Sequence, residues 1–228
     1  ARRCRELCDQ KGAALVIDDV RAGLRMAYGC SWETVGVKPD LSAWSKAIGN
    51  GHPIAIVAGS DSLRDAAAKV FATGSFWFSA VPMAAAIACI EFAQKERIIE
   101  HMHAMGTLLR DGIARQADAH GFRLRQTGPP QMPLMLFDDD PKFELGTRWT
   151  SAAARRGVYL HPFHNMFLCA AHAEADIRET EFKSAGPEVR TIYFEYDQYG
   201  LSADATDALR GNVEWLKKTG LKVLVEGH

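Results

Sequence analysis

The chain has 228 residues, of which 47% are hydrophobic and 24% charged, a composition typical of a globular protein with a sizeable core. The formal net charge of −1 gives no global electrostatic reason to expect nucleic acid or an anionic membrane as a partner, and no apolar run approaches the length of a membrane span. The five cysteines are scattered and odd in number, which makes a poor disulfide framework and fits a reducing cytoplasm.

Helices and strands are predicted to alternate in the first half of the chain. The expected ranges are a helix ending near residue 11, strands at 13–17 and 54–58, and helices at about 60–71 and 82–117. The acidic pair Asp18 and Asp19 follows the first strand directly, and Pro82 is expected to open the last helix. This alternation predicts a parallel sheet with covering helices.

The pattern changes after His120 to shorter elements separated by turns. The expected ranges are strands at 122–125, 134–137 and 158–161, with a helix at 144–156. These elements predict a smaller α+β domain. The polar, turn-rich segment Glu181–Pro187 is the expected linker, and a strand at 190–195, a helix at 202–218 and a strand at 222–226 are expected beyond it.

Asp18 and Lys46 form the candidate catalytic pair. A pyridoxal-phosphate (PLP) enzyme needs a lysine amine to hold the cofactor aldehyde as an imine, and a carboxylate to keep the ring nitrogen protonated. Both groups belong at the carboxyl ends of strands, where open α/β sheets bind ligands. By residue type alone, an Asp after a strand is more often a helix cap, and a Lys before glycines is more often a solvated loop residue.

Three segments resemble the class III aminotransferases, and most closely the glutamate-1-semialdehyde aminomutase-like branch. They are LVIDDVRAGLR at 15–25, KPDLSAWSKAIGNG at 38–51, and the run 52–59. The spacing of 28 residues from Asp18 to Lys46 is similar to that of the family. Residues 157–176 also resemble its C-terminal domain, so the similarity covers roughly residues 1–180. Asp19 stands where the family usually has Glu.

The resemblance implies an α/β fold, with part of a fold-type I PLP transferase large domain and a small α+β C-terminal domain. The implied ranges are 1–118 for the C-terminal half of the large domain, 119–180 for the small domain, 181–188 for a linker and 189–228 for a short appended βαβ tail. The implied function is PLP-dependent aminotransferase or aminomutase chemistry on a small amino or keto substrate. The family's N-terminal half, with most of the phosphate-binding residues, has no counterpart, which predicts a fragment.

The implied cofactor-binding residues are Lys46, Asp18, Val20 and Ser79, with Lys46 as the Schiff-base lysine and Val20 packed on the cofactor ring. The family usually has a Thr that reaches the phosphate across a homodimer interface, but Trp77 stands at that position here. Ser79, or else Ser75, is the expected substitute. Packing in the core or in an interface is expected for Phe76, Trp77 and Phe78, and core positions are expected for Trp44, Met83 and Trp149.

Other readings concern the tail and the histidines. Residues 189–228 resemble the first half of an outer-membrane-protein-A-like, peptidoglycan-associated domain, so the alternatives to the enzyme are a cell-envelope module and an inactive chimeric fragment. The tail ends before that family's ligand-binding Asp and Arg, so peptidoglycan is a partner only under the cell-envelope alternative and its binding is assigned to no particular residue here. His161, His164 and His172 could suggest a metal site, but Pro162 breaks the frame that a site would need, and no metal is expected.

Overall fold

A computed structural model describes residues 1–179, together with 206–207, 209–211 and 213–214. The chain divides into two compact units, unit 1 at Ala1–His101 and unit 2 at Met102–His228. The domain limits expected from the resemblance, 1–118 and 119–180, stay predictions. No helix among the described residues is long and apolar enough to cross a membrane.

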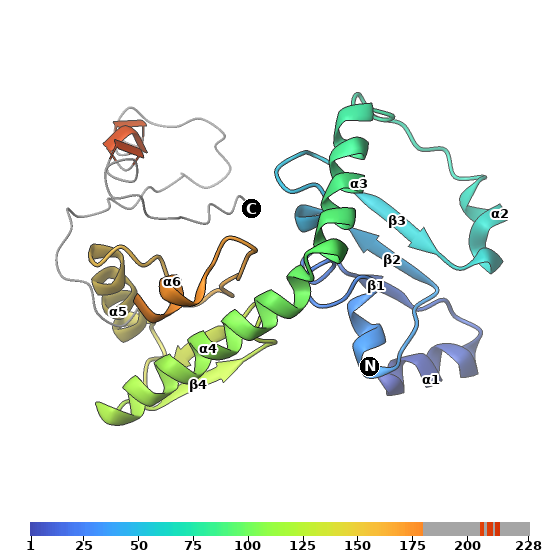
Figure 1. Cartoon of the computed structure of the whole chain (residues 1–228). Coiled ribbons are helices and arrows are strands. Elements are labelled where there is room, and N and C mark those ends of the chain that lie inside the picture. Colours follow the sequence, from blue (N-terminus) through green and yellow to red (C-terminus); the bar gives the residue numbers. More distant parts are fainter. Residues whose placement is uncertain (180–205, 208, 212, 215–228) are drawn as a thin grey trace. The chain divides into compact units, whose positions relative to one another are not determined.

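Unit 1 is built around a small sheet with helices beside it (Figure 1). Its elements are α1 (Arg2–Lys11), β1 (Val16–Asp18), the 3-10 turn η1 (Ser31–Val35), β2 (Leu41–Trp44), η2 (Lys46–Ile48), β3 (Ile56–Gly59), η3 (Asp61–Leu63), α2 (Arg64–Ala67) and α3 (Ala80–Lys95). The strand β2 lies within the segment 38–51, where the sequence pattern indicates a motif but no separate strand. The single helix expected at 60–71 is instead η3 followed by the short α2.

The sheet has the order β1-β2-β3, and its two pairings differ in direction. Strands β1 and β2 are parallel, with Asp18 opposite Ala43. Strands β2 and β3 are antiparallel, with Trp44 opposite Ile56. The expectation of a wholly parallel sheet is therefore wrong for β3. The segment 45–55 turns back beside β2, whereas a parallel partner requires a crossover that passes over the sheet.

The core of unit 1 follows the alternation of β1. Leu15 and Ile17 are buried, while Val16 between them is 58% exposed, as expected when successive strand side chains point to opposite faces. These two residues pack with Trp44 of β2, Ile48 of η2 and Ala86 of α3, so α3 covers the buried side of the sheet. The core position expected for Trp44 is confirmed. That of Met83 is wrong, because Met83 is 44% exposed on α3.

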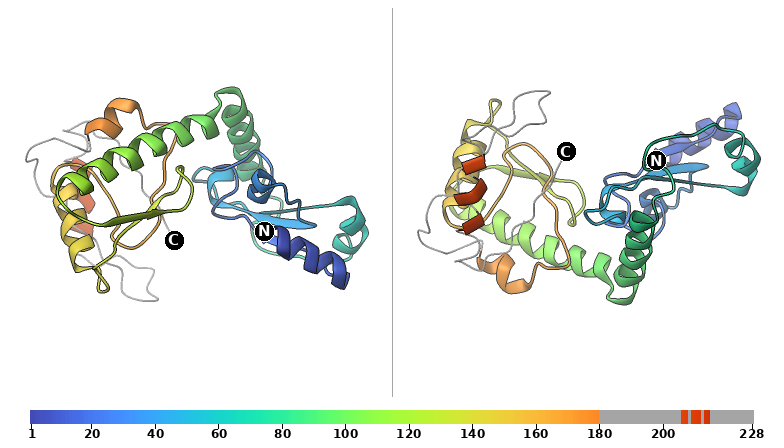
Figure 2. Two further views of the ribbon diagram at one scale, coloured as in Figure 1. Left: turned by 90° about the horizontal axis from the view of Figure 1, so that it is seen from below. Right: turned by 90° about the horizontal axis from the view of Figure 1, so that it is seen from above.

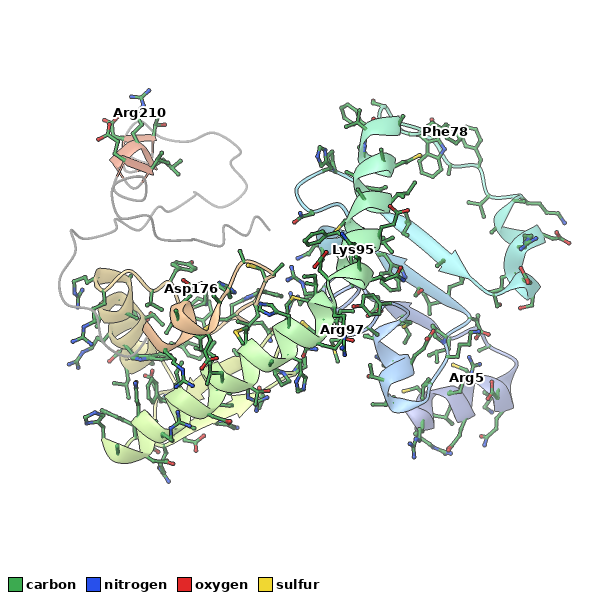
Figure 3. The ribbon with its side chains drawn as sticks, viewed as in Figure 1. Arg5, Phe78, Lys95, Arg97, Asp176 and Arg210 are labelled. Carbon is green, nitrogen blue, oxygen red and sulfur yellow. The ribbon has the colours of Figure 1, made fainter. Side chains whose placement is uncertain are left out.

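The helix expected at 82–117 is two helices, α3 and α4 (Ile98–Ala119). They meet at a bend where Arg97 has a left-handed backbone with φ 53° (Figure 3). A left-handed residue cannot continue a right-handed helix. Tyr28 supports the bend from a neighbouring loop, since its hydroxyl donates to the Ala93 carbonyl at 3.0 Å and contacts the Glu100 carboxylate at 3.2 Å.

Unit 2 contains α4 from Met102 onward, β4 (Leu124–Thr127), β5 (Leu134–Phe137), α5 (Glu144–Arg155) and α6 (Glu174–Glu179). Strands β4 and β5 form an antiparallel pair, and the Gln126 amide donates to the Arg110 carbonyl, which ties β4 to α4 (Figure 2). The ring of Trp149 on α5 packs edge-on against Phe137. The strand expected at 158–161 is wrong, because that segment is irregular.

Beyond residue 161 the chain runs beside the segment that precedes β5. The N–H groups of Met166 and Leu168 donate to the carbonyls of Pro133 and Gln131. The expected linker at 181–188 and the expected strands at 190–195 and 222–226 lie outside the described residues. Residues 206–207, 209–211 and 213–214 are helical, in agreement with the helix expected at 202–218.

Candidate active site

The two predicted catalytic residues lie at the same edge of the sheet. Asp18 is the last residue of β1, and Lys46 begins η2, two residues after β2 ends at Trp44. Because β1 and β2 are parallel, both strands end on this side. The Asp19 N–H donates to the Ala43 carbonyl at 2.9 Å, so the pairing continues past the end of β1. The tertiary structure thus brings together two residues that are 28 positions apart.

The Asp18 side chain is exposed at the end of β1, on the face opposite the buried Ile17. The Val20 N–H donates to Oδ1 of Asp18 at 3.1 Å, which fixes the orientation of the carboxylate. The other oxygen, Oδ2, has no hydrogen bond that the described residues supply, so it can accept one from a ligand. Val20 itself is half-buried.

Asp19 has the opposite environment, with only 1% of its surface exposed. The Ser31 N–H donates to Oδ2 at 2.7 Å, and the Ser31 hydroxyl donates to Oδ1. Burial raises the pKa of the neighbouring Cys30 thiol, and the Asp19 carboxylate adds to that rise. Sequence reasoning noted Asp19 only as a replacement for Glu. Successive strand side chains point to opposite faces, so the position of Asp19 directly after the outward-facing Asp18 was the signal that Asp19 points inward.

Lys46 has a backbone conformation that side-chain-bearing residues rarely adopt. Its φ is 49°, in the left-handed region. Hydrogen bonds on either side hold it there, since the Ser45 hydroxyl donates to the Ile54 carbonyl at 2.8 Å and the Gly49 N–H donates to the Lys46 carbonyl at 3.1 Å. Residues with such backbones cluster at functional sites, where the surrounding structure over-determines them. No sequence signal at Lys46 indicated this conformation.

The glycines near the site serve the backbone turns. A Cβ on Gly49 would lie 2.3 Å from the His52 carbonyl oxygen, so only glycine fits this turn after η2. A Cβ on Gly23 would lie 2.5 Å from the Trp44 ring. The loop that follows Asp19 therefore packs directly on the end of β2, next to Lys46.

Ser79 belongs to a different element from Asp18 and Lys46. It precedes α3, and its N–H donates to the Phe76 carbonyl at 3.1 Å. Among the described residues, no hydrogen bond joins Ser79 to Asp18 or Lys46. Phe76, Trp77 and Phe78 are 83%, 55% and 80% exposed, so core packing is wrong for all three and the interface interpretation stays a prediction (Figure 3).

A third acid, Asp40, lies at the opposite end of strands β1 and β2. Oδ2 of Asp40, the residue before β2, accepts hydrogen bonds from the Leu15 N–H and the Arg5 guanidinium, both at 2.7 Å. The Leu15 N–H, and after it Arg5, hold the pKa of Asp40 below its ordinary value. This clamp joins Arg5 of α1, labelled in Figure 3, to the residues immediately before β1 and β2. Sequence reasoning used Asp40 only as part of a motif.

The three histidines considered for a metal site make ring and hydrogen-bond contacts with their neighbours. The rings of His161 and His164 pack edge-on, with centroids 5.5 Å apart. Nδ1 of His172 accepts the Cys169 N–H at 3.1 Å. A hydrogen bond between the side chains of His172 and Cys169 lowers the pKa of the Cys169 thiol. In the described ranges, no three His, Cys, Asp or Glu side chains gather to hold a metal ion.

Comparisons with known proteins agree on one family. The family model described as aminotransferase class-III matches residues 1–173. The chain is 52% identical over 180 residues to an aminopentol aminotransferase of Sphingopyxis macrogoltabida, covering 79% of this chain and 43% of that protein. It is 29% identical over 195 residues to a glutamate-1-semialdehyde 2,1-aminomutase of Geotalea daltonii, covering 77% of this chain and 45% of that protein.

A solved structure has a similar fold. It is the PLP internal aldimine form of the FumI protein of Sphingopyxis sp. MTA144, with a TM-score of 0.76 and 52% identity over 78% of this chain and 43% of that one. The chain thus spans less than half the length of each of these three relatives. The fold of the matched part is that of the PLP-dependent transaminases.

Proposed function

Because the chain belongs to the class III aminotransferases, we propose that it contributes the lysine-bearing part of a PLP-dependent aminotransferase or aminomutase. Lys46 would hold the cofactor aldehyde, and Asp18 would pair with the ring nitrogen. The observation that carries this proposal is the placement of Asp18 and Lys46 at the carboxyl ends of the neighbouring parallel strands β1 and β2. Ligands of open α/β sheets bind at this edge.

The side chains present at this edge fit such a cofactor. PLP, when bound, supplies an electron sink for the carbon next to the substrate's amino group. An ionised Asp18 can only accept hydrogen bonds, and its free Oδ2 would hold a proton on a pyridine nitrogen. Lys46 offers a primary amine that can bind an aldehyde and later move a proton at the substrate's α-carbon. The strained backbone of Lys46 sets where that amine begins.

Two further contacts belong to the proposal. Half-buried Val20 follows Asp18 directly and would lie against the ring. The hydroxyl of Ser79 forms no capping bond with α3, so it can donate to a phosphate oxygen. The exposed Phe76, Trp77 and Phe78 would be covered in a homodimer, which is the assembly the family resemblance implies. Burial of such large apolar side chains is the usual source of interface energy.

The substrate class and location are also proposals. The 52% identity to an aminopentol aminotransferase supports a small-molecule amine paired with a keto compound as substrates. The chain's five cysteines are all free thiols, which supports a reducing, cytoplasmic location. Neither nucleic acid nor membrane enters the proposed reaction.

Trapping the cofactor tests the lysine assignment. Incubation with PLP, reduction with borohydride and peptide mass spectrometry should locate a pyridoxyl group on Lys46. The variant Lys46→Ala should lose the visible cofactor absorbance and this label. Lys38→Ala is the matched control, since Lys38 is an exposed lysine in the same segment, and it should label like the parent. Equal labelling of Lys46→Ala and the parent contradicts the proposal.

The alternative function concerns the tail. Association of residues 189–228 with peptidoglycan stays a prediction from resemblance, as does an inactive chimeric fragment. The tail lies beyond the family match at 1–173. A sedimentation assay with purified peptidoglycan separates the two functions, because the enzyme proposal expects the chain to remain in the supernatant.

A further inference from the structure

We propose that Asp19 is a positioning residue, which aims the Asp18 carboxylate into the site and couples it to the segment that carries Lys46. This inference rests on the proposed function. It concerns a buried acid that the proposed chemistry does not use, because its 1% exposure keeps it from substrate and cofactor.

The first step is the burial of a carboxylate with dedicated donors. A buried carboxylate is costly unless hydrogen bonds satisfy it. Asp19 receives one bond to each oxygen, from the N–H and the hydroxyl of Ser31, and the Cys30 thiol also faces it. These bonds fasten residue 19 to the start of η1, 12 residues further along the chain.

The alternation of side chains along β1 fixes which of the two acids points inward. Side chains alternate along a strand, so a single-residue slip would exchange the environments of Asp18 and Asp19. With the Asp19 carboxylate held inside by Ser31, the Asp18 carboxylate must point to the exposed face. The Asp19 N–H bond to the Ala43 carbonyl at 2.9 Å holds the same register from the side of β2.

The third step links Asp19 to the neighbourhood of Lys46. The Asp19 carbonyl accepts the Gly23 N–H at 2.7 Å, which closes the turn after β1. Gly23 in turn packs on the Trp44 ring so closely that a Cβ would lie 2.5 Å away. Trp44 is separated from Lys46 by one residue. The buried acid therefore anchors a continuous set of contacts that starts beside Asp18 and ends beside Lys46.

The substitution Asp19→Asn keeps the size of the side chain and removes the matched acceptor. An amide has one acceptor oxygen, so its NH2 group would either face the Ser31 N–H or require the Ser31 hydroxyl to turn from donor to acceptor. In both cases the charge-assisted bonds to the carboxylate are lost. Ser31→Ala removes only the hydroxyl donor and leaves the backbone bond in place. Asp65→Asn is the matched control, because Asp65 is an exposed acid in α2 of the same unit.

The test measures the protonation state of the PLP ring nitrogen directly. The full chain and each variant are loaded with ¹⁵N-labelled PLP, the ring nitrogen signal is recorded across pH, and PLP affinity is measured by absorbance titration. Thermal unfolding without cofactor reports on folding. We expect Asp19→Asn to move the ring signal toward neutral pyridine and to weaken PLP binding about tenfold to a hundredfold, the equivalent of one lost hydrogen bond to a charged group.

The control should match the parent, and Ser31→Ala should shift the ring signal in the same direction by a smaller amount. The inference is overturned if both Asp19→Asn and Ser31→Ala leave the ring signal at the parent position, even when the thermal midpoint falls, because that pattern describes a purely structural residue. If Asp19→Asn does not fold, Ser31→Ala decides alone. A parent chain in which PLP never reaches Lys46 would instead refute the proposed function.

Discussion

Removal of the Asp40 carboxylate should destabilise unit 1 more than any exposed ion pair on α1. In Asp40→Ala the N–H of the buried Leu15 loses its acceptor, which costs about 1–3 kcal/mol. The ion pair with Arg5 contributes less than this bond, because its two side chains are 22% and 31% exposed and solvent partly screens their charges. The expected loss in the free energy of unfolding is therefore about 1–3 kcal/mol from the Leu15 hydrogen bond, with a smaller addition from the ion pair.

Urea denaturation followed by far-UV circular dichroism measures this loss. Two further variants separate the contribution of the ion pair from that of the Leu15 hydrogen bond. Arg5→Ala removes the ion pair but leaves the Leu15 bond, so it should cost less than Asp40→Ala. Arg3→Ala removes an exposed pair with Glu6 and should change stability by less than about 0.5 kcal/mol. A loss for Asp40→Ala below about 0.5 kcal/mol, the range of ordinary surface substitutions, would refute the reasoning. So would equal losses for Asp40→Ala and Arg5→Ala.

The same clamp predicts the direction of an acid effect. The folded chain lowers the pKa of Asp40, so its contribution is fully present above the unfolded pKa of about 3.9 and is lost as pH falls through the lower folded value. Unfolding free energy should thus decrease in this acid range in the parent. Asp40→Ala should show a shallower decrease, and parallel curves would argue against the clamp.

Two further predictions concern one residue in each unit. Gly23→Ala should destabilise unit 1 by about 1–3 kcal/mol, because the new methyl group would overlap the Trp44 ring; a thermal midpoint equal to that of the parent would contradict this contact. His172→Ala should slow alkylation of Cys169 near neutral pH, because the hydrogen bond with His172 that lowers the thiol pKa would be lost. Unchanged kinetics in a mass-spectrometric alkylation assay would show that His172 does not lower the pKa of this thiol.

The sequence alone predicted those elements whose local pattern is strong. The strand expected at 134–137 has the bounds of β5, the helix expected at 144–156 matches α5, and the strand before Asp18 is β1 shifted by a few residues. The class of fold and the class III family also followed from the sequence motifs. Local patterns succeed here because hydrophobic periodicity and flanking turn residues depend on near neighbours in the chain.

Other features depended on contacts between distant residues. The antiparallel direction of β3 follows from the return of residues 45–55 beside β2, and the bend at Arg97 follows from a left-handed backbone supported through Tyr28. Neither leaves a periodic signal. The exposure of Phe78 was equally invisible, since its ring is as apolar as any core residue and only its neighbours decide whether it is covered.

The features of the candidate site also divide into those that the sequence predicted and those that only the tertiary structure decided. Sequence similarity selected Asp18 and Lys46 and their chemistry, because residue type and spacing persist in a family. The tertiary structure alone decided that the two share one sheet edge, that Lys46 has a strained backbone and that Asp19 is buried against Ser31. Register, burial and backbone strain arise when strands pair and side chains pack, so a linear sequence cannot specify them residue by residue.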